Sequence, residues 1–415
     1  MSGLQLRWIG AMVLIIGSLF TTGCFDRTEL EEQAFLIIIG FDNPRPDVYT
    51  VIARMAIPSK LSGTSGQGGG ASGSGDFDQG TPIVAAQGRT IHEALSLMNM
   101  GIERKINLSH LSAIIFSEKT AKKGLLPYLR TLSRYREFRR NHYLFISHGN
   151  LQKLMKAQKP LMESSATRYM EDLHLISGSL GYAPSIQVEQ YLNALYSPSI
   201  DPILPVLSVN SEKTEHKNTK LHFKPGHIDR SGGNPVECVG TALFHHDKMV
   251  GMLDGMDTRF LQLLNGTIKH IEMAIPSPFQ KNVYLSVGIR LSKSSKKAFV
   301  LQGAHRYIAI RQNLEAELLG DQGTISYVNE KNRAILEQTI SNFVENHENR
   351  LIYKLLHKKK TVPFNFIEEA RAKFATYPAY AAFPWGSTLA EIPVRCDVSA
   401  VMRRLGSQLN APISP

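Results

Sequence analysis

Three cysteines carry the most reactive side chains of the chain, and the first stands where covalent modification is expected. Cys24 follows the small residues 21–23, and an apolar run over residues 8–20 precedes them. The run is shorter than the ~20 apolar residues of a bilayer-spanning helix and fits the core of a secretory signal peptide. Small residues before a cysteine are typical of the cleavage site of bacterial lipoproteins. We therefore expect residues 1–23 to be a lipoprotein signal peptide and Cys24 to be the site of lipid attachment.

Acylation of Cys24 would hold the rest of the chain at a membrane surface. The thiol is alkylated with diacylglycerol and the peptide is cut before it; two or more acyl chains hold a protein stably, whereas one is marginal. An uncleaved anchor helix with an incidental cysteine is the alternative, because Thr21 stands where such leaders usually have an aliphatic residue. Both interpretations place the body outside the membrane, since no later stretch reaches ~18 uninterrupted apolar residues.

The other reactive residues do not form a catalytic or metal-binding pattern. Ser294 and Lys297 have Ser-x-x-Lys spacing, but they stand in a charged turn without companion motifs. His245 and His246 are adjacent and would face opposite sides of an extended strand, so a solvated turn explains them better than a metal pair. We expect no enzymatic activity, no cofactor and no metal site.

Two further patterns are also weak. The histidines at 216, 222 and 227 are five or six residues apart and lack the i, i+4 spacing of a helical metal pair. The glycines at 68, 70 and 73 match a dinucleotide fingerprint in form only, because they stand in low-complexity sequence and no apolar helix follows at once. Neither pattern changes the expectation of a non-catalytic protein.

The two remaining cysteines, Cys238 and Cys396, both stand in strand-like runs. Three cysteines cannot form a disulfide scaffold for a chain of this size. Two buried free thiols are the favoured interpretation, since cysteine is commonly buried for packing alone. A bridge between the two is the alternative.

Length and composition predict a folded body of more than one domain. The chain has 415 residues, of which 43% are hydrophobic and 20% are charged, so a packed core is expected and global disorder is not. We expect an α+β protein with mixed β-sheets and flanking helices in two to three subdomains. The expected units are an N-terminal α/β domain over residues 24–200 and a C-terminal α+β domain over residues 201–410. A division of the C-terminal domain into two subdomains near residue 280 is the alternative. Residues 62–80 are rich in glycine and are expected to be a flexible loop.

Strand-like and helix-like segments alternate through the first half, which indicates α/β or α+β layering. Thr90 and Glu93 have capping-box spacing, so their side chains can satisfy the first free amides of a helix. The expected strands cover residues 34–41, 48–57, 81–87, 110–116 and 143–146. The expected helices cover residues 90–98, 118–134 with a break near Gly124 and Pro127, 151–157 and 163–196.

The second half is expected to begin with strands and to contain one long helix. Ile335, Ile340, Phe343, Leu351 and Leu355 form an apolar stripe at helical spacing within residues 327–360. A shorter helix is expected over residues 257–264, and strands over residues 204–209, 221–224, 236–244, 249–253, 269–275, 283–291, 299–310 and 392–401.

The formal net charge of +11 is compatible with nucleic acid, an anionic membrane surface, an acidic partner, or simply a solvated basic surface. The segment Arg134–Arg140 interleaves Tyr135 and Phe138 with basic residues, a pattern that nucleic-acid binding can use. Export argues against nucleic acid as a partner. Contact with lipid headgroups or with a partner subunit is one interpretation of this segment, and a solvated helix end is the other.

Seven segments, in order along the chain, resemble the C-subunit lipoproteins of spore germinant receptors, the Ger(x)C family. One departure is Phe25, where the family usually has tryptophan after the cysteine. The segments are residues 23–30 (GCFDRTEL), 87–95 (QGRTIHEAL), 110–118 (HLSAIIFSE), 121–125 (AKKGL), 139–141 (RRN), 240–253 (GTALF and DKMVGML) and 402–406 (MRRLG).

The resemblance implies a fold, a location and partners. Members of this family are α+β proteins on the outer face of the inner spore membrane. They act with two integral membrane subunits, of A-type and B-type, in a receptor that senses nutrients and is required for spore germination. The resemblance implies no enzymatic activity and no cofactor, and it attributes the small-molecule site to a membrane subunit.

Two other classes of function are weighed against this one. An extracytoplasmic solute-binding lipoprotein of a membrane transporter needs two lobes and usually an aromatic-rich pocket, whereas the chain has only two tryptophans, Trp8 and Trp385. A cell-wall hydrolase needs a catalytic constellation that the sequence does not offer. The sequence names neither the nutrient nor the contact surface.

Overall fold

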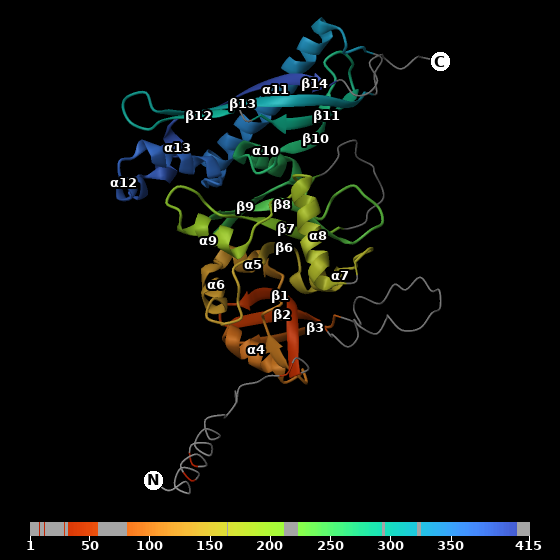
Figure 1. The fold of residues 1–415 in the computed structure, drawn as a ribbon, viewed down its shortest axis with the longest axis vertical. Coiled ribbons are helices and arrows are strands. Elements are labelled where there is room, and N and C mark those ends of the chain that lie inside the picture. Colours follow the sequence, from red (N-terminus) through yellow and green to blue (C-terminus); the bar gives the residue numbers. More distant parts are fainter. Residues whose placement is uncertain are drawn as a thin grey trace.

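The computed structural model describes residues 8, 12, 29, 32–56, 81–163, 165–210, 223–292, 295–321 and 325–404. Within these residues the chain forms two β-sheets flanked by helices (Figure 1). The expected α+β class with mixed sheets is therefore confirmed. The signal peptide, Cys24 and the glycine-rich residues 62–80 lie outside the described residues, apart from Trp8 and Met12.

The first sheet has nine strands in the order β3-β2-β1-β5-β6-β7-β8-β9, with β4 paired to β1. Its centre, β1-β5-β6-β7, is parallel, and the strands on both sides are antiparallel. The central strands are apolar runs buried on both faces, as parallel strands between helical layers must be. The strands are β1 (Gln33–Arg45), β2 (Val48–Ala56), β3 (Ile83–Gly88), β4 (Lys105–Asn107), β5 (Ala113–Ser117), β6 (Tyr143–His148), β7 (Ile203–Val209), β8 (Val236–His245) and β9 (Lys248–Leu253).

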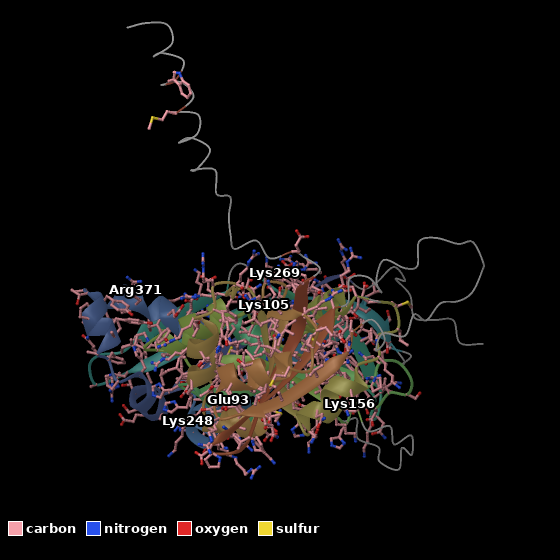
Figure 2. The ribbon with its side chains drawn as sticks, turned by 90° about the horizontal axis from the view of Figure 1, so that it is seen from below. Glu93, Lys105, Lys156, Lys248, Lys269 and Arg371 are labelled. Carbon is pink, nitrogen blue, oxygen red and sulfur yellow. The ribbon has the colours of Figure 1, made fainter. Side chains whose placement is uncertain are left out.

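Helices cover both faces of this sheet (Figure 1), and Figure 2 shows the same ribbon from below with its side chains. One core contains apolar side chains from α4, α5, α6 and α9, and the core on the opposite face contains those from α7 and α8. The sheet is thus the middle layer of three. The helices are α4 (Ile91–Asn99), α5 (Glu118–Lys123), α6 (Leu126–Leu132), α7 (Leu151–Ala157), α8 (Ala166–Ser179) and α9 (Val188–Tyr196).

The predicted cap of α4 is present in a slightly different form. The Thr90 hydroxyl accepts a hydrogen bond from the Glu93 amide at 3.0 Å, as the spacing predicts. The Glu93 carboxylate accepts from the Arg89 amide at 2.6 Å rather than from Thr90. Two amides at the start of the helix are satisfied in this way.

The position expected for the domain boundary, near residue 200, falls between α9 and β7. Strands from both sides of that position share the first sheet, which continues to Leu253. The helix α10 (Gly255–Asn265) then leads to the second sheet, whose first strand begins at His270. The change from one sheet to the other therefore lies between residues 253 and 270.

The second sheet has five strands in the order β10-β11-β13-β12, with β14 parallel to β13. The side chains of β10 alternate between buried and exposed, which shows one covered face and one open face. The long helix α11 and helix α10 pack on the covered face, and Figure 1 shows α10 between the two sheets. The elements are β10 (His270–Pro276), β11 (Tyr284–Leu291), β12 (Lys296–Val300), β13 (Tyr307–Asp321), α11 (Glu330–Tyr353) and β14 (Val394–Arg404).

Three expectations in this half are corrected. Residues 299–310 are not one strand, because a polar turn containing Gly303, with φ of +91°, separates β12 from β13. Phe223 and Lys224 do not form a strand, and residues 221–222 lie outside the described residues. The helix predicted over 327–360 is α-helical only to Tyr353; a π-helical turn over 354–359 follows and ends at Lys360 in the left-handed conformation.

Short helices fill the segment between the π-helical turn and β14. Their apolar side chains, among them Phe366, Tyr380, Trp385 and Leu389, belong to the same core as α10 and α11. This core, which contains α10 and α11, thus holds most of the C-terminal half together. The elements are a 3₁₀ helix (Asn365–Lys373), α12 (Tyr377–Ala381) and α13 (Trp385–Glu391).

Candidate functional site

The predicted lipid-attachment residue, Cys24, lies outside the described residues, so the structure does not place it. The first strand begins at Gln33, nine residues after Cys24, and nine extended residues span at most ~30 Å. An anchor at Cys24 would therefore keep the first sheet close to the surface that holds it. No helix in the part of the chain that the structure describes has the length and apolar character needed to cross a membrane.

Of the weak catalytic pair Ser294 and Lys297, the structure describes only Lys297. Lys297 forms an ion pair with Glu369 and lies over the Phe366 ring at 5.6 Å from its centroid, while Ser294 lies outside the described residues. Across the described ranges, no three histidine, cysteine or acidic side chains are grouped so that they could hold a metal ion.

The turn expected at His245 and His246 is confirmed, but the two rings do not point to opposite sides. His246 has a left-handed backbone with φ of 53°, which takes it out of the strand geometry. The ring centroids lie 4.4 Å apart as a result. Side-chain alternation along a strand therefore does not apply to this pair.

Asp201 connects three distant segments next to this turn. Its carboxylate accepts hydrogen bonds from the His246 amide at 3.1 Å and from the Val362 amide at 2.8 Å, and it lies 3.3 Å from His245 Nδ1. The Asp201 amide in turn donates to the Val362 carbonyl at 2.8 Å. One largely buried acid thus links the residues before β7, the β8–β9 turn and the segment after the π-helical turn.

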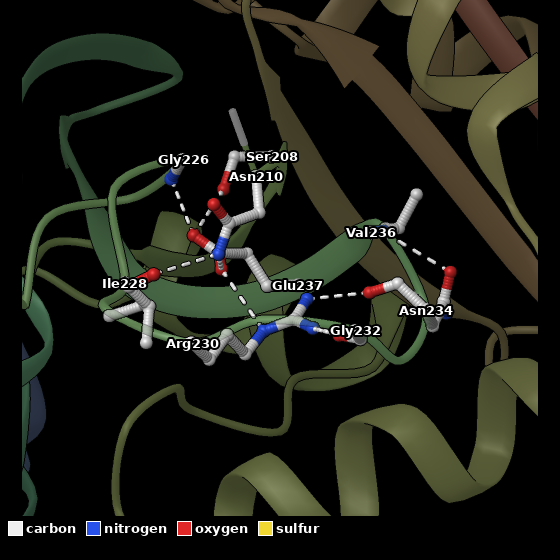
Figure 3. Close-up of polar contacts among 9 residues, drawn as sticks. All are labelled: Ser208, Asn210, Gly226, Ile228, Arg230, Gly232, Asn234, Val236 and Glu237. Carbon is white, nitrogen blue, oxygen red and sulfur yellow. Dashed lines mark hydrogen bonds and ion pairs between the residues drawn. The ribbon is translucent and has the colours of Figure 1, made fainter. Parts of the chain in front are cut away.

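Glu237 forms the centre of a second buried polar cluster (Figure 3). Its carboxylate accepts hydrogen bonds from the Gly226 amide at 2.6 Å, from Asn210 Nδ2 at 2.9 Å and from the Ser208 hydroxyl at 3.3 Å. Arg230 Nε lies 3.8 Å from the same carboxylate. Burial raises the pKa of Glu237, and the Gly226 amide and Arg230 act in the opposite direction.

Arg230 extends this cluster along the same loop. Its guanidinium donates to the backbone carbonyls of Gly232 and Asn234 at 2.7 and 2.5 Å, and Asn234 Nδ2 donates to the Tyr169 hydroxyl at 2.6 Å. Figure 3 shows how these contacts hold residues 226–234 against β7 and β8, and the Asn234–Tyr169 hydrogen bond joins them to α8. Their role is structural, because every donor and acceptor named here is used within the chain.

Cys238 and Cys396 are both buried and free, in agreement with the favoured expectation. Cys238 belongs to the first sheet and Cys396 to the second. The Cys396 thiol donates to Glu348 Oε2 at 3.0 Å. Burial raises the pKa of Cys238 to about 12 and raises the pKa of Cys396 further, with Glu348 adding to the latter shift.

The basic segment Arg134–Arg140 divides its side chains between the core and solvent. Tyr135 and Phe138 pack against the core that α4, α5, α6 and α9 form on the first sheet. The Tyr135 hydroxyl is hydrogen-bonded to His92 Nδ1 at 2.9 Å. The arginines of the segment are exposed. The aromatic rings therefore contribute to packing rather than to an exposed surface on which bases could stack.

Two family models match most of the chain. A model of the spore germination protein N-terminal domain matches residues 26–209, and a model of the spore germination B3/GerAC-like C-terminal domain matches residues 239–406. The fold and these matches define a spore germination protein. The chain belongs to the Ger(x)C family of such proteins.

Several relatives are similar over much of the chain. It is 26% identical to YfkR of Bacillus subtilis (strain 168) over 66% of this chain and 64% of the relative, and 25% identical to spore germination protein KC of the same organism over 47% of each. Spore germination protein GerQC of Bacillus cereus is 24% identical over 86% of this chain and 88% of its own length. The chain thus spans less than two thirds of YfkR and of KC.

One solved structure is similar over most of the chain. It is the crystal structure of the GerBC protein, with 17% sequence identity and a TM-score of 0.48, and the match covers 88% of this chain and 96% of that chain.

Proposed function

We propose that this chain is a non-catalytic subunit of a nutrient germinant receptor, required for spore germination, and that lipid on Cys24 anchors it. The match to both spore germination domains supports the receptor role. The N-terminal match begins at residue 26, directly after Cys24 and its apolar leader, and this position supports the anchor. No catalytic arrangement among the described residues competes with a binding or scaffolding role.

The proposed partners are two integral membrane subunits, of A-type and B-type, on the outer face of the inner spore membrane. An anchored body is confined to the plane of its partners, which raises its effective concentration without tight pairwise contacts. Any signalling role requires that the chain bind two states of the assembly with different affinity.

The anchor is tested by replacing Cys24 with alanine in the full chain. The Cys24→Ala protein is expected to leave the membrane fraction and to reduce germination in response to nutrients. Cys238→Ala is the matched control, because it removes a buried thiol and leaves the proposed attachment site intact. Normal membrane retention and normal germination with Cys24→Ala would contradict the proposal.

The partners are tested by recovering the tagged full chain from detergent-solubilised spore membranes. Two polytopic proteins are expected to accompany it. Recovery of a transporter permease instead would support the solute-binding alternative and would count against the receptor.

A further inference from the structure

A cavity of about 610 Å³ lies where the first-sheet unit meets the C-terminal half. Its walls come from residues 195–202, the β8–β9 turn, residues 356–362 and the start of α13. Helices α9 and α13, which flank it, lie on the same side of the molecule in Figure 1. A volume of this size is within the range of small-molecule sites.

Besides hydroxyl groups, the polar wall of the cavity carries one lysine and three histidines. Lys360 and the imidazoles of His245, His246 and His357 line it. Asp201 is the one carboxylate among the described lining residues, and the Val362 and His246 amides already hydrogen-bond to it. Asp201 also lies 3.3 Å from His245 Nδ1, so these two side chains are engaged with each other. Lys360 and the imidazoles of His246 and His357 remain on the wall as donors, and they favour a guest that offers acceptor oxygens, such as a carboxylate.

The rest of the wall is apolar. Leu195, Ile200, Leu356, Val362 and Trp385 contribute to it. Trp385 is almost completely buried, and its indole Nε1 donates to the Tyr380 carbonyl at 3.1 Å. The indole is therefore fixed, and Trp385 is one of the residues that line the cavity.

Two residues of this wall have a conformation that side chains rarely adopt. Three non-glycine residues in the described ranges have positive φ, and His246 and Lys360 are two of them, at 53° and 52°. They come from separate segments and line the same cavity. Each has a local reason, the β8–β9 turn at His246 and the helix end at Lys360, and together they fix the backbone on two sides of the cavity.

We propose that this cavity binds a small organic acid with an apolar tail. Lys360 and the imidazoles would hold the acid group, and the Trp385 side would hold the tail. The site is independent of the lipid anchor, so it goes beyond the function proposed above. A charged group at one end and an apolar wall at the other are the features that fix the orientation of such a ligand.

The test uses hexanoate as the probe, and 1-hexanol and hexylamine as probes of matched length without the negative charge. Trp385 supplies the signal, because the chain has only one other tryptophan, Trp8, which the full-chain variant Trp8→Phe removes. Hexanoate is expected to change the Trp385 emission saturably and to release or take up heat in calorimetry. The two control probes are expected to bind at least tenfold more weakly, about the effect of losing one charge-assisted hydrogen bond.

Lys360→Asn removes the cation and keeps a residue that tolerates the left-handed backbone. It is expected to weaken hexanoate binding about tenfold. Lys358→Asn is the matched control, because Lys358 is exposed and does not line the cavity. His246→Asn serves as a second variant at the other left-handed position, and thermal melts of all variants check that they fold.

Three results would overturn the proposal. They are a lack of any saturable response to hexanoate, binding of 1-hexanol as tight as that of hexanoate, and an equal loss of affinity in Lys358→Asn and Lys360→Asn. The first would show that no such site exists, the second that the cavity is only apolar, and the third that overall charge rather than this wall governs binding.

Discussion

The carboxyl group of Glu348 allows a quantitative prediction. Glu348 lies on α11, is completely buried, and accepts from the Cys396 thiol at 3.0 Å. Desolvation raises its pKa from 4.5 to about 8. Glu348 Oε1 and Gln312 Oε1 both lack a hydrogen-bond partner within the described residues. Hydrogen bonds from the Cys396 and Gln312 side chains lower the pKa of Glu348, but by less than desolvation raises it, so we expect the neutral acid near pH 7.

The sign of the pH effect follows from the direction of the shift. The folded state holds the proton more tightly than the unfolded state, so the stabilisation is complete below pH ~4.5 and is lost as pH rises to about 8. The shift of about 3.5 pKa units, the difference between 8 and 4.5, corresponds to at most ~5 kcal/mol. The parent chain is therefore expected to lose several kcal/mol of stability over this interval from this group.

Glu348→Gln removes the titration and keeps the size of the side chain. Its amide can donate to Gln312 in place of the proton. We expect the variant to match the parent within ~1 kcal/mol at pH 4.5 and to be more stable than the parent by several kcal/mol at pH 8. Urea unfolding at a series of pH values, followed by the emission of buried Trp385, measures both free energies.

Glu391→Gln is the control, because the Glu391 side chain is 65% exposed and its replacement should leave the pH dependence unchanged. The reasoning would be refuted if Glu348→Gln and the parent had the same pH dependence. It would also be refuted if the variant were less stable than the parent at pH 8, since that would mean that an ionised Glu348 stabilises the fold.

Three further predictions concern other buried groups. Asp201→Ala leaves the His246 and Val362 amides without their acceptor, and we expect a loss of ~1–3 kcal/mol in urea unfolding; an unchanged midpoint would show that Asp201 does not hold the junction. Glu237→Leu removes the acceptor of three donors and should cost at least ~2 kcal/mol and increase proteolysis near residues 226–234, whereas equal cleavage of variant and parent would argue against the clamp. Cys238 and Cys396 are buried thiols with raised pKa values, so iodoacetamide at pH 8 should modify them only after unfolding, and rapid labelling of the native chain would contradict their burial.

Much of the fold could be predicted from local pattern. The apolar run at residues 34–41 is long, bounded and rich in β-branched residues, and it forms the buried strand β1. The cap at Thr90 depends on neighbours three residues apart and is visible in the sequence for the same reason. The turn at Gly303 was missed, although the glycine and the polar residues around it interrupt the apolar runs on both sides and are themselves a signal for a turn.

The groups that join distant segments could not be predicted in this way. Asp201 and Val362 are hydrogen-bonded although they lie far apart in the sequence, and nothing in the local sequence of either residue indicates the pairing. Glu237 stands in an apolar run, and its burial becomes understandable only with the Gly226 amide beside it. The extent of the first sheet beyond residue 200 likewise depends on strand pairing, which no periodicity encodes.

Intact mass spectrometry of the chain purified from spore membranes tests the central claim of this account most directly. The predicted result is a polypeptide that starts at Cys24 and carries diacylglycerol on that sulfur. A polypeptide that retains residues 1–23 with an unmodified Cys24 thiol would contradict the proposed anchor and, with it, the proposed place of the chain in a membrane receptor.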